Sequence, residues 1–131
     1  MESELRPGLV GEARVQVGPA ELASAMGSGS VYVYGTPAMI GLMESAAINA
    51  VDHLLPEGWA SVGTRLDVRH LAPSPPGVEV RARAELTAVE GRRLTFRVEA
   101  SDPVDLIGEG THERALVEVS RLVARAEAKR P

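Results

Sequence analysis

Residues 36–47, TPAMIGLMESAA, decide how the rest of the chain must fold. The stretch predicts the start of a helix, with Thr36 as the N-cap and Pro37 in the first helical position. We expect the helix to continue to about Leu55, because Pro56 and Gly58 follow and end it. The helix is apolar around most of its circumference, so it must be buried on several sides.

Glu44 is the exception within this apolar helix. Stepping 100° per residue separates a polar face from the face that holds Glu44. The polar face consists of Ser45, Asn49, Asp52 and His53, and the neighbours of Glu44 are Pro37, Ile40, Ala47, Ile48 and Val51. The carboxylate therefore stands alone on an apolar face.

Outside the helix, the apolar residues alternate with a period of two, which indicates strands. Strands are predicted at 9–17 (an edge strand), 61–72, 78–88, 94–100 and about 106–119, with a tight turn at Glu90-Gly91. In the first strand the apolar positions are Val10, Ala13, Val15 and Val17. In the second strand, Val62, Thr64, Leu66, Val68 and His70 share one face, opposite Gly63, Arg65, Asp67 and Arg69.

The last predicted strand and the C-terminal segment each show a further feature. Gly108 and Gly110 interrupt the alternation of the last strand, which predicts a bulge or a close backbone approach. The final segment, SRLVARAEAK, predicts a short helix capped by Ser120.

The order of elements predicts an α+β protein in which one antiparallel sheet, with its last four strands in meander spacing, curls around one long central helix. This arrangement is the hotdog fold, here expected as a single domain over residues 1–131. One sheet covers only one side of the helix. We therefore expect a partner subunit to cover the remaining apolar surface, in a homodimer or larger assembly.

Composition excludes several classes of function. The net charge is −4 and no basic block stands out, which argues against nucleic acid as a partner. There is no cysteine, so disulfides, thiol nucleophiles and cysteine-bound metals are excluded. No signal peptide and no membrane-spanning run are evident, so a cytoplasmic location is expected. The three histidines lack the short spacing of a metal site, and no cofactor is predicted.

Glu44 and His70 are the first candidates for chemistry. A carboxylate on an apolar face must find donors or change its pKa, and such groups serve as nucleophiles or general bases. The plain alternative is a partly exposed helix glutamate. His70 lies on the apolar face of its strand, where a lone histidine is more often a core residue. Beside a buried glutamate it becomes an acid/base or electrostatic partner.

Thr36 is the third candidate, with a plain helix cap as its alternative role. Free N–H groups and the positive dipole end at a helix N-terminus can stabilise an oxyanion. Thr36 and Glu44 are eight residues apart, about 12 Å along one helix and about 80° around it. They cannot meet within that helix, so we hypothesise that Thr36 of one chain meets Glu44 of a second chain in a two-fold dimer.

Several other residues are weaker candidates for a functional role. His112 lies in GEGTHERA, residues 108–115, and His53 lies on the polar helix face. Arg92 and Arg93 could meet a phosphate, although such a pair is more often a solvated hairpin tip. Gly35, which ends an extended piece next to the helix, and Arg93 are counted among the substrate-binding residues.

The runs TPAMIGLMESAA, GTRLDVRHLAPSPPG, VEGRRLTFRVEA and GEGTHERALV resemble the fluoroacetyl-CoA thioesterase-like branch of the hotdog thioesterases. The resemblance covers residues from about 35 to 128. It implies that Thr36, Glu44 and His70 form a catalytic constellation for acyl-CoA hydrolysis, and that Gly63 lines the substrate site. Upstream, AMGSGSVYVYG lacks the phenylalanines of the fluoroacetyl-specific members. A broader or different acyl preference is expected.

The resulting hypothesis is a homodimeric acyl-CoA thioesterase that acts on a short-chain or small-acyl thioester. Glu44 acts as base or nucleophile, His70 transfers protons or stabilises charge, and Thr36 binds the thioester oxygen or attacks it. Direct water attack and an acyl-enzyme both stay open, as does the choice between coenzyme A and acyl carrier protein. The alternatives are a non-catalytic acyl-CoA-binding protein and, last, an enoyl-thioester hydratase.

Overall fold

The computed structural model describes residues 4–131. Its main elements are β1 (Val10–Gln16), α1 (Thr36–Val51), β2 (Trp59–His70), β3 (Glu79–Glu90), β4 (Arg93–Ser101), β5 (Leu106–Glu118) and α2 (Val119–Glu127). Short 3-10 helices at Pro19–Glu21 and Asp52–Leu54 precede and follow α1 in the chain. No helix in residues 4–131 is both long and apolar enough to cross a membrane.

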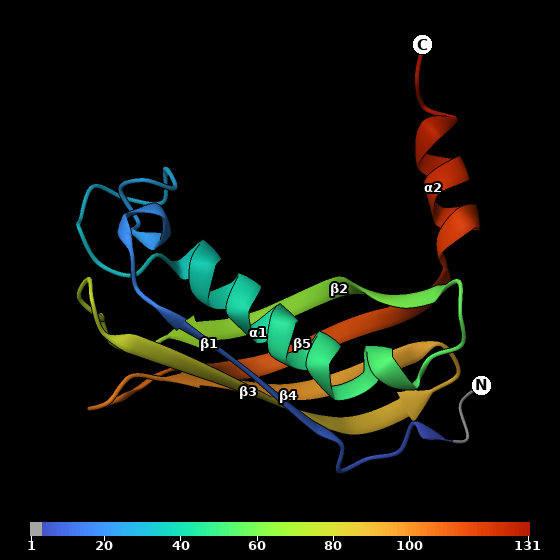
Figure 1. The fold of residues 1–131 in the computed structure, drawn as a ribbon, viewed down its shortest axis with the longest axis horizontal. Coiled ribbons are helices and arrows are strands. Elements are labelled where there is room, and N and C mark those ends of the chain that lie inside the picture. The colour runs from blue at the N-terminus through green and yellow to red at the C-terminus, as the bar shows by residue number, and fades with distance from the viewer. Residues whose placement is uncertain (1–3) are drawn as a thin grey trace.

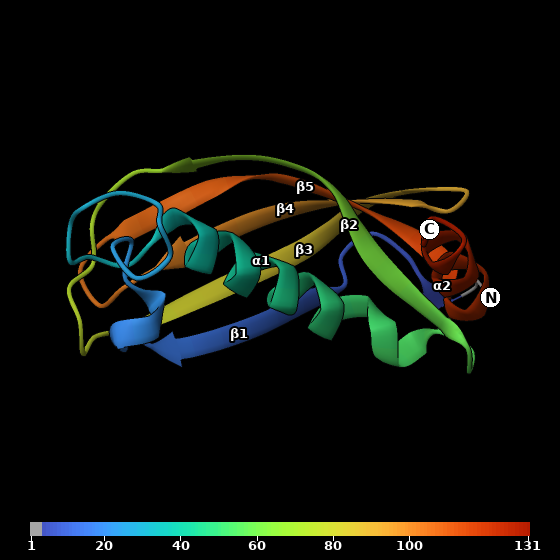
Figure 2. The ribbon, with the colours of Figure 1, turned by 90° about the horizontal axis from the view of Figure 1, so that it is seen from above.

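The five strands form one antiparallel sheet in the order β1-β3-β4-β5-β2, and α1 lies across one face of it (Figure 1, Figure 2). The α+β arrangement predicted from the sequence is therefore confirmed, with β1 at an edge as expected. The prediction that the last four strands follow one another as a meander is wrong for β2. Only β3, β4 and β5 form the meander, and β2 pairs with β5 at the far edge.

The core lies between α1 and the sheet. The alternation predicted for β3 and β4 is confirmed from Val80 to Leu86 and from Leu94 to Ala100, where every second residue is buried. It fails at Ala88, because the register of β3 with β4 shifts after Leu86 and Val89 packs against the core instead. The buried strand residues are Val80, Ala82, Ala84, Leu86, Leu94, Phe96, Val98 and Ala100, and the buried helix residues are Met39, Met43, Ala46, Ala47, Ala50 and Val51. Burial of these side chains is the main favourable term for the fold.

The bounds of α1 differ from the prediction at both ends. Gly35, with extended backbone, is the N-cap, and Thr36 is the first helical residue. The α-helix ends at Val51, and Asp52–Leu54 continues it as one 3-10 turn before Pro56. The threonine hydroxyl is therefore not used as a cap and is free for another partner.

The C-terminal helix α2 is present as predicted, but its cap is Glu118 and not Ser120. It stands away from the sheet at the end where β5 finishes (Figure 1). None of its residues is buried, and Val119, Leu122 and Val123 are exposed apolar side chains on it.

Edge strand β1 packs on α1 by backbone contact. A Cβ atom at Gly11 would lie closer than 3.0 Å to the backbone of Ala46 and Ala50. Gly11 is buried, whereas Val10, one of the apolar positions of the predicted strand, is 41% exposed. The inward positions of β1 are thus 11, 13 and 15, because the glycine and not the valine meets the helix.

Replacing Gly11 by alanine should destabilise the protein by about 1–3 kcal/mol or more, because the new methyl group overlaps helix backbone that cannot rotate away. The free energy of unfolding from denaturant titration checks this. Val10→Ala at the neighbouring exposed position is the control and should stay within roughly 0.5 kcal/mol of the parent protein. Equal stability of Gly11→Ala and the parent would contradict the close packing of β1 on α1.

Candidate active site

Two groups of polar residues lie along α1, one at its N-terminus and one in its middle. At the N-terminus, Thr36 Oγ1 and His70 Nδ1 are 2.8 Å apart, which is a hydrogen bond. Burial holds the pKa of His70 below its usual value, so the imidazole is neutral at pH 7. The sequence placed these two residues on different elements, and the structure brings them together within one chain.

The helix N-terminus beside Thr36 keeps donors available. Gly35 has no side chain to cap the helix, and Pro37 has no N–H group. The first N–H groups of a helix have no partner within the helix. Gly35 itself is buried, and a Cβ there would lie 3.2 Å from the backbone of Ala23. A glycine at position 35 therefore has a structural role, because the loop before α1 packs closely against it. It also lies next to Thr36 in the site.

A hollow of about 360 Å³ opens beside the Thr36–His70 pair. Its walls come from the loop that leads into α1, including Val31, Val33 and Tyr34, and from the residues that follow His70. Burial raises the pKa of Tyr34 to about 12. The Tyr34 hydroxyl and His70 Nε2 are buried without a hydrogen-bond partner in residues 4–131. Buried polar atoms without a partner are rare in folded proteins, and a catalytic role is one of the explanations for them.

The second group surrounds Glu44. Arg114 Nη1 lies 3.4 Å from Glu44 Oε2, and the two side chains are 4% and 37% exposed. The apolar environment predicted for Glu44 is therefore only half correct. Its neighbours on the helix are apolar, but a buried arginine from β5 provides its charge partner, and part of the carboxylate faces solvent.

Arg114 is held on every side of its guanidinium. Its Nε donates to Ser61 Oγ and its Nη2 donates to the Ser61 carbonyl, both at 2.8 Å. Ser61 Oγ in turn donates to Asp52 Oδ1 at 2.6 Å. Burial lowers the pKa of Arg114, while the charges of Glu44 and Asp52 raise it. Two carboxylates thus stabilise one buried cation, and its position is defined by hydrogen bonds.

His112 completes this group. Its Nδ1 lies 2.8 Å from the Arg65 carbonyl and its Nε2 lies 3.1 Å from Arg114 Nη1. The carbonyl can only accept and the guanidinium can only donate, so His112 is neutral with its proton on Nδ1. Burial, assisted by the charge of Arg114, keeps its pKa below the usual value. The sequence makes His112 a weak candidate. It gives no sign of Arg114 as the charge partner of Glu44, or of Ser61 and Asp52 as the residues that hold this arginine.

Gly63 lies on the helix-facing side of β2, contrary to the predicted alternation. The register of β2 with β5 shifts between Gly63 and Arg65, so Thr64 is the extra residue of a bulge. The bulge moves Gly63 to the same side of the sheet as His70. A Cβ at Gly63 would lie closer than 3.0 Å to Glu44 Oε2. The glycine therefore leaves the space that the carboxylate occupies.

The remaining predicted residues lie elsewhere. Arg93 forms an exposed ion pair with Glu90, 3.3 Å apart, at the β3–β4 turn. Arg92 stacks its guanidinium 4.9 Å above the ring of Trp59. His53 is exposed in the 3-10 turn after α1, as predicted. Within residues 4–131, no group of three or more His, Cys, Asp or Glu side chains could hold a metal ion.

The sheet that curls around α1 is the fold of the hotdog thioesterases. The family model described as fluoroacetyl-CoA-specific thioesterase matches residues 17–120, and the chain belongs to this family. It is 48% identical over 99 residues to the fluoroacetyl-CoA thioesterase of Streptantibioticus cattleyicolor, covering 76% of this chain and 71% of the relative. The predictions of the hotdog fold, of this branch and of a thioester hydrolase are confirmed.

Solved structures agree with this assignment. The chain is similar to the fluoroacetyl-CoA thioesterase FlK, with a TM-score of 0.92, 38% identity, and coverage of 98% of this chain and 100% of FlK. It is also similar to a thioesterase superfamily member from Thermus thermophilus, with a TM-score of 0.88, 30% identity, and coverage of 96% and 93%. FlK has also been solved as a threonine-to-serine variant in complex with acetyl-CoA.

Replacing Gly63 by alanine should push the Glu44 carboxylate away from Arg114 while the sheet stays intact, because the overlapping atom belongs to a flexible side chain. A crystal structure of the variant should show Glu44 in another rotamer, with a loss of stability of about 1–3 kcal/mol. Gly58→Ala, at a turn with a positive φ and open space, is a control for loss of a glycine away from the site. An unmoved Glu44 in Gly63→Ala would contradict the packing described for this carboxylate.

Proposed function

We propose that the protein hydrolyses a small-acyl thioester of coenzyme A to the free acid and the thiol, with Thr36, His70 and Glu44 as its catalytic residues. The observation that carries the proposal is the Thr36–His70 hydrogen bond at an uncapped helix N-terminus, in the wall of a hollow of about 360 Å³. Such a terminus supplies N–H donors where an oxyanion develops.

The roles follow from the surroundings of each group. With Nδ1 as the acceptor, His70 takes the proton of the Thr36 hydroxyl or of a water held beside it. The N–H groups of Thr36 and Ala38 receive the thioester oxygen. Glu44, partly exposed and paired with Arg114, is accessible to substrate, so it serves as base or nucleophile. Coenzyme A enters only as part of the substrate.

The acyl group is small or short in this proposal. The loop that lines the hollow contributes Val31, which is 60% exposed, and Val33, and it contains no phenylalanine. An open apolar wall of this kind discriminates weakly between small acyl groups, because one methylene is worth only about 1–3 kcal/mol. Acetyl, propionyl and fluoroacetyl thioesters are therefore all expected as substrates. A cytoplasmic location belongs to the same proposal, because coenzyme A thioesters are metabolites of the cell interior.

Substitution of each proposed catalytic residue tests this function. Thr36→Ala, His70→Asn and Glu44→Gln should each lower kcat/KM for acetyl-CoA about 10²–10⁴-fold, as expected for loss of an acid/base or oxyanion-binding group. Thiol release is measured across a panel of acyl-CoA thioesters. Ser45→Ala, at the exposed helix position next to Glu44, is the control and should keep full activity.

The same panel separates the alternatives. Saturable binding of acyl-CoA without thiol release would favour a non-catalytic binding protein. Consumption of an enoyl thioester without thiol release would favour a hydratase. Full activity in Glu44→Gln and Thr36→Ala together would refute the proposed site.

We also propose that the working form is a homodimer in which each site combines two chains. Thr36 and Glu44 lie about 12 Å apart along one helix, so one chain cannot bring both to the same carbonyl carbon. Edge strand β2 offers unpaired backbone groups, and Ile48 beside Glu44 is 38% exposed. A two-fold partner at β2 would pair these edges and set the two helices antiparallel.

A mixed dimer tests the shared site. A dimer of one Thr36→Ala chain and one Glu44→Gln chain concentrates both defects in one site and leaves the other intact, so about half of the wild-type kcat is expected. The two chains carry different affinity tags, so that mixed dimers can be isolated. If each site lay within one chain, both sites would carry one defect and the mixed dimer would be as inactive as the single variants.

A further inference from the structure

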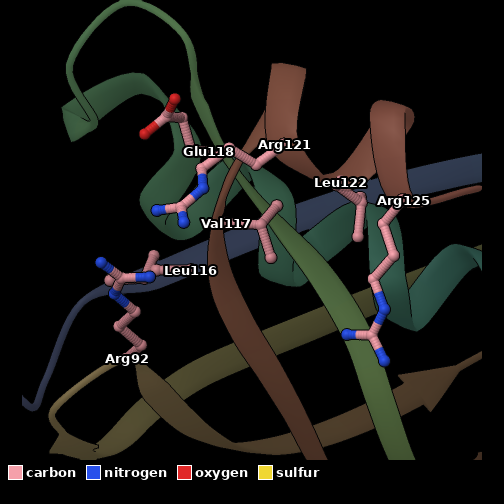
Figure 3. Close-up of a pocket in the computed structure, with 7 residues that line it drawn as sticks. All are labelled: Arg92, Leu116, Val117, Glu118, Arg121, Leu122 and Arg125. Atoms are coloured by element: carbon pink, nitrogen blue, oxygen red, sulfur yellow. The ribbon is translucent and has the colours of Figure 1, made fainter.

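A second hollow, of about 400 Å³, lies between the end of β5, the β3–β4 turn and α2 (Figure 3). Arg92 lines it from the turn, and Arg121 and Arg125 line it from α2. We call this hollow the arginine groove. Its other lining residues include Leu116, Leu122 and Glu118.

The charge of the arginine groove is not neutralised. Five arginines on or beside the sheet, at positions 65, 81, 83, 93 and 97, each have a carboxylate within 4.0 Å. Across the described residues 4–131, no such pair involves Arg92, Arg121 or Arg125. Three cations against Glu118 leave a local excess of positive charge in a chain of net charge −4. A local excess of this sign attracts anions.

The groove is held in shape by three contacts. Arg92 is stacked on Trp59, which limits the freedom of its guanidinium. The Leu116 N–H donates to the Arg92 carbonyl at 2.8 Å, and the Val119 N–H donates to the Gly58 carbonyl at 2.9 Å. The base of α2 is therefore tied to the sheet. Arg121 and Arg125 are four residues apart, so they lie on one face of the helix.

The groove also lies in line with the proposed active site. Leu116 follows Arg114 by two residues on β5, about 7 Å along the strand. Arg114 contacts Glu44, so the groove begins two residues along β5 from the arginine that pairs with Glu44. A substrate whose thioester lies at Glu44 and whose carrier is long and phosphorylated can extend to this end of the sheet.

We propose that the arginine groove binds the phosphate groups at the nucleotide end of coenzyme A. The inference rests on the proposed function and names the residues that would hold the nucleotide end of its substrate. Guanidinium groups bind phosphate oxygens in pairs of parallel hydrogen bonds, and the apolar side chains of Leu116 and Leu122 offer a surface for the adenosine. An acidic carrier protein is the rival ligand.

The test compares substrates with and without the nucleotide. In Arg121→Gln/Arg125→Gln, KM for acetyl-CoA should rise at least about tenfold with kcat unchanged, because charge-assisted hydrogen bonds to phosphate are lost. KM for acetyl-pantetheine, which lacks the nucleotide, should not change. Arg81→Gln/Arg83→Gln is the matched control: it removes the same charge from β3 and should leave both KM values unchanged.

Binding of adenosine 3′,5′-bisphosphate provides a readout that needs no catalysis, so it distinguishes failure of the groove from failure of the thioesterase proposal. Calorimetry should show saturable binding that weakens with salt and falls at least about tenfold in the arginine double variant. No binding to the parent protein would overturn the inference. So would equal effects of the double variant on both substrates, or a KM change confined to an acyl-carrier-protein substrate.

Discussion

The packing of α1 against the sheet is the constraint on which the rest of the molecule depends. One helix buries a stripe from Met39 to Val51 on the strands, and Gly11 lets β1 approach its backbone. Because the helix is rigid and its rotation is set by this stripe, the positions of Thr36 and Glu44 are set at the same time. The hydrophobic core thus orients both polar groups of the site.

The charged group around Glu44 is built on a buried arginine, Arg114. A buried cation such as Arg114 is tolerated because Ser61, Asp52, His112 and Glu44 satisfy it together. Ser61 and His112 hydrogen-bond to the guanidinium from within the protein, and Asp52 holds the Ser61 hydroxyl. Glu44 alone approaches from the partly open side, at the longer distance of 3.4 Å. The carboxylate is therefore the member of the group that substrate can reach.

The two polar groups lie at the N-terminus and in the middle of α1, and they offer different chemical groups. The N-terminal group offers a hydroxyl, a neutral imidazole and free N–H donors, which suit a carbonyl oxygen that gains charge. The middle group offers a carboxylate beside a fixed cation. A single chain keeps them about 12 Å apart, so the geometry of the helix itself connects the proposed reaction to the proposed dimer.

Much of the fold was predictable because it depends on local periodicity. The helix, the five strands and the turn at Gly91 all follow from spacing of 3.6 or 2 and from glycine or proline. The errors arise where backbone geometry overrides the pattern. The bulge at Thr64 moved Gly63 to the helix side of β2, and the extended conformation of Gly35 replaced the expected threonine cap. Neither has a signal in the alternation of apolar residues.

The sequence by itself determined the elements and the curled sheet around one helix. It also predicted a role for Glu44, since an isolated carboxylate on an apolar helix can be recognised from spacing, and it named Thr36 and His70 as candidates. Only the tertiary structure decided what surrounds them. Arg114 is 70 residues from Glu44 and 53 from Ser61 in the chain. The sequence gives little sign of the role of His112, because a strand histidine has no special local pattern. Contacts over such separations depend on strand order and register, which the chain acquires only when the sheet closes around the helix.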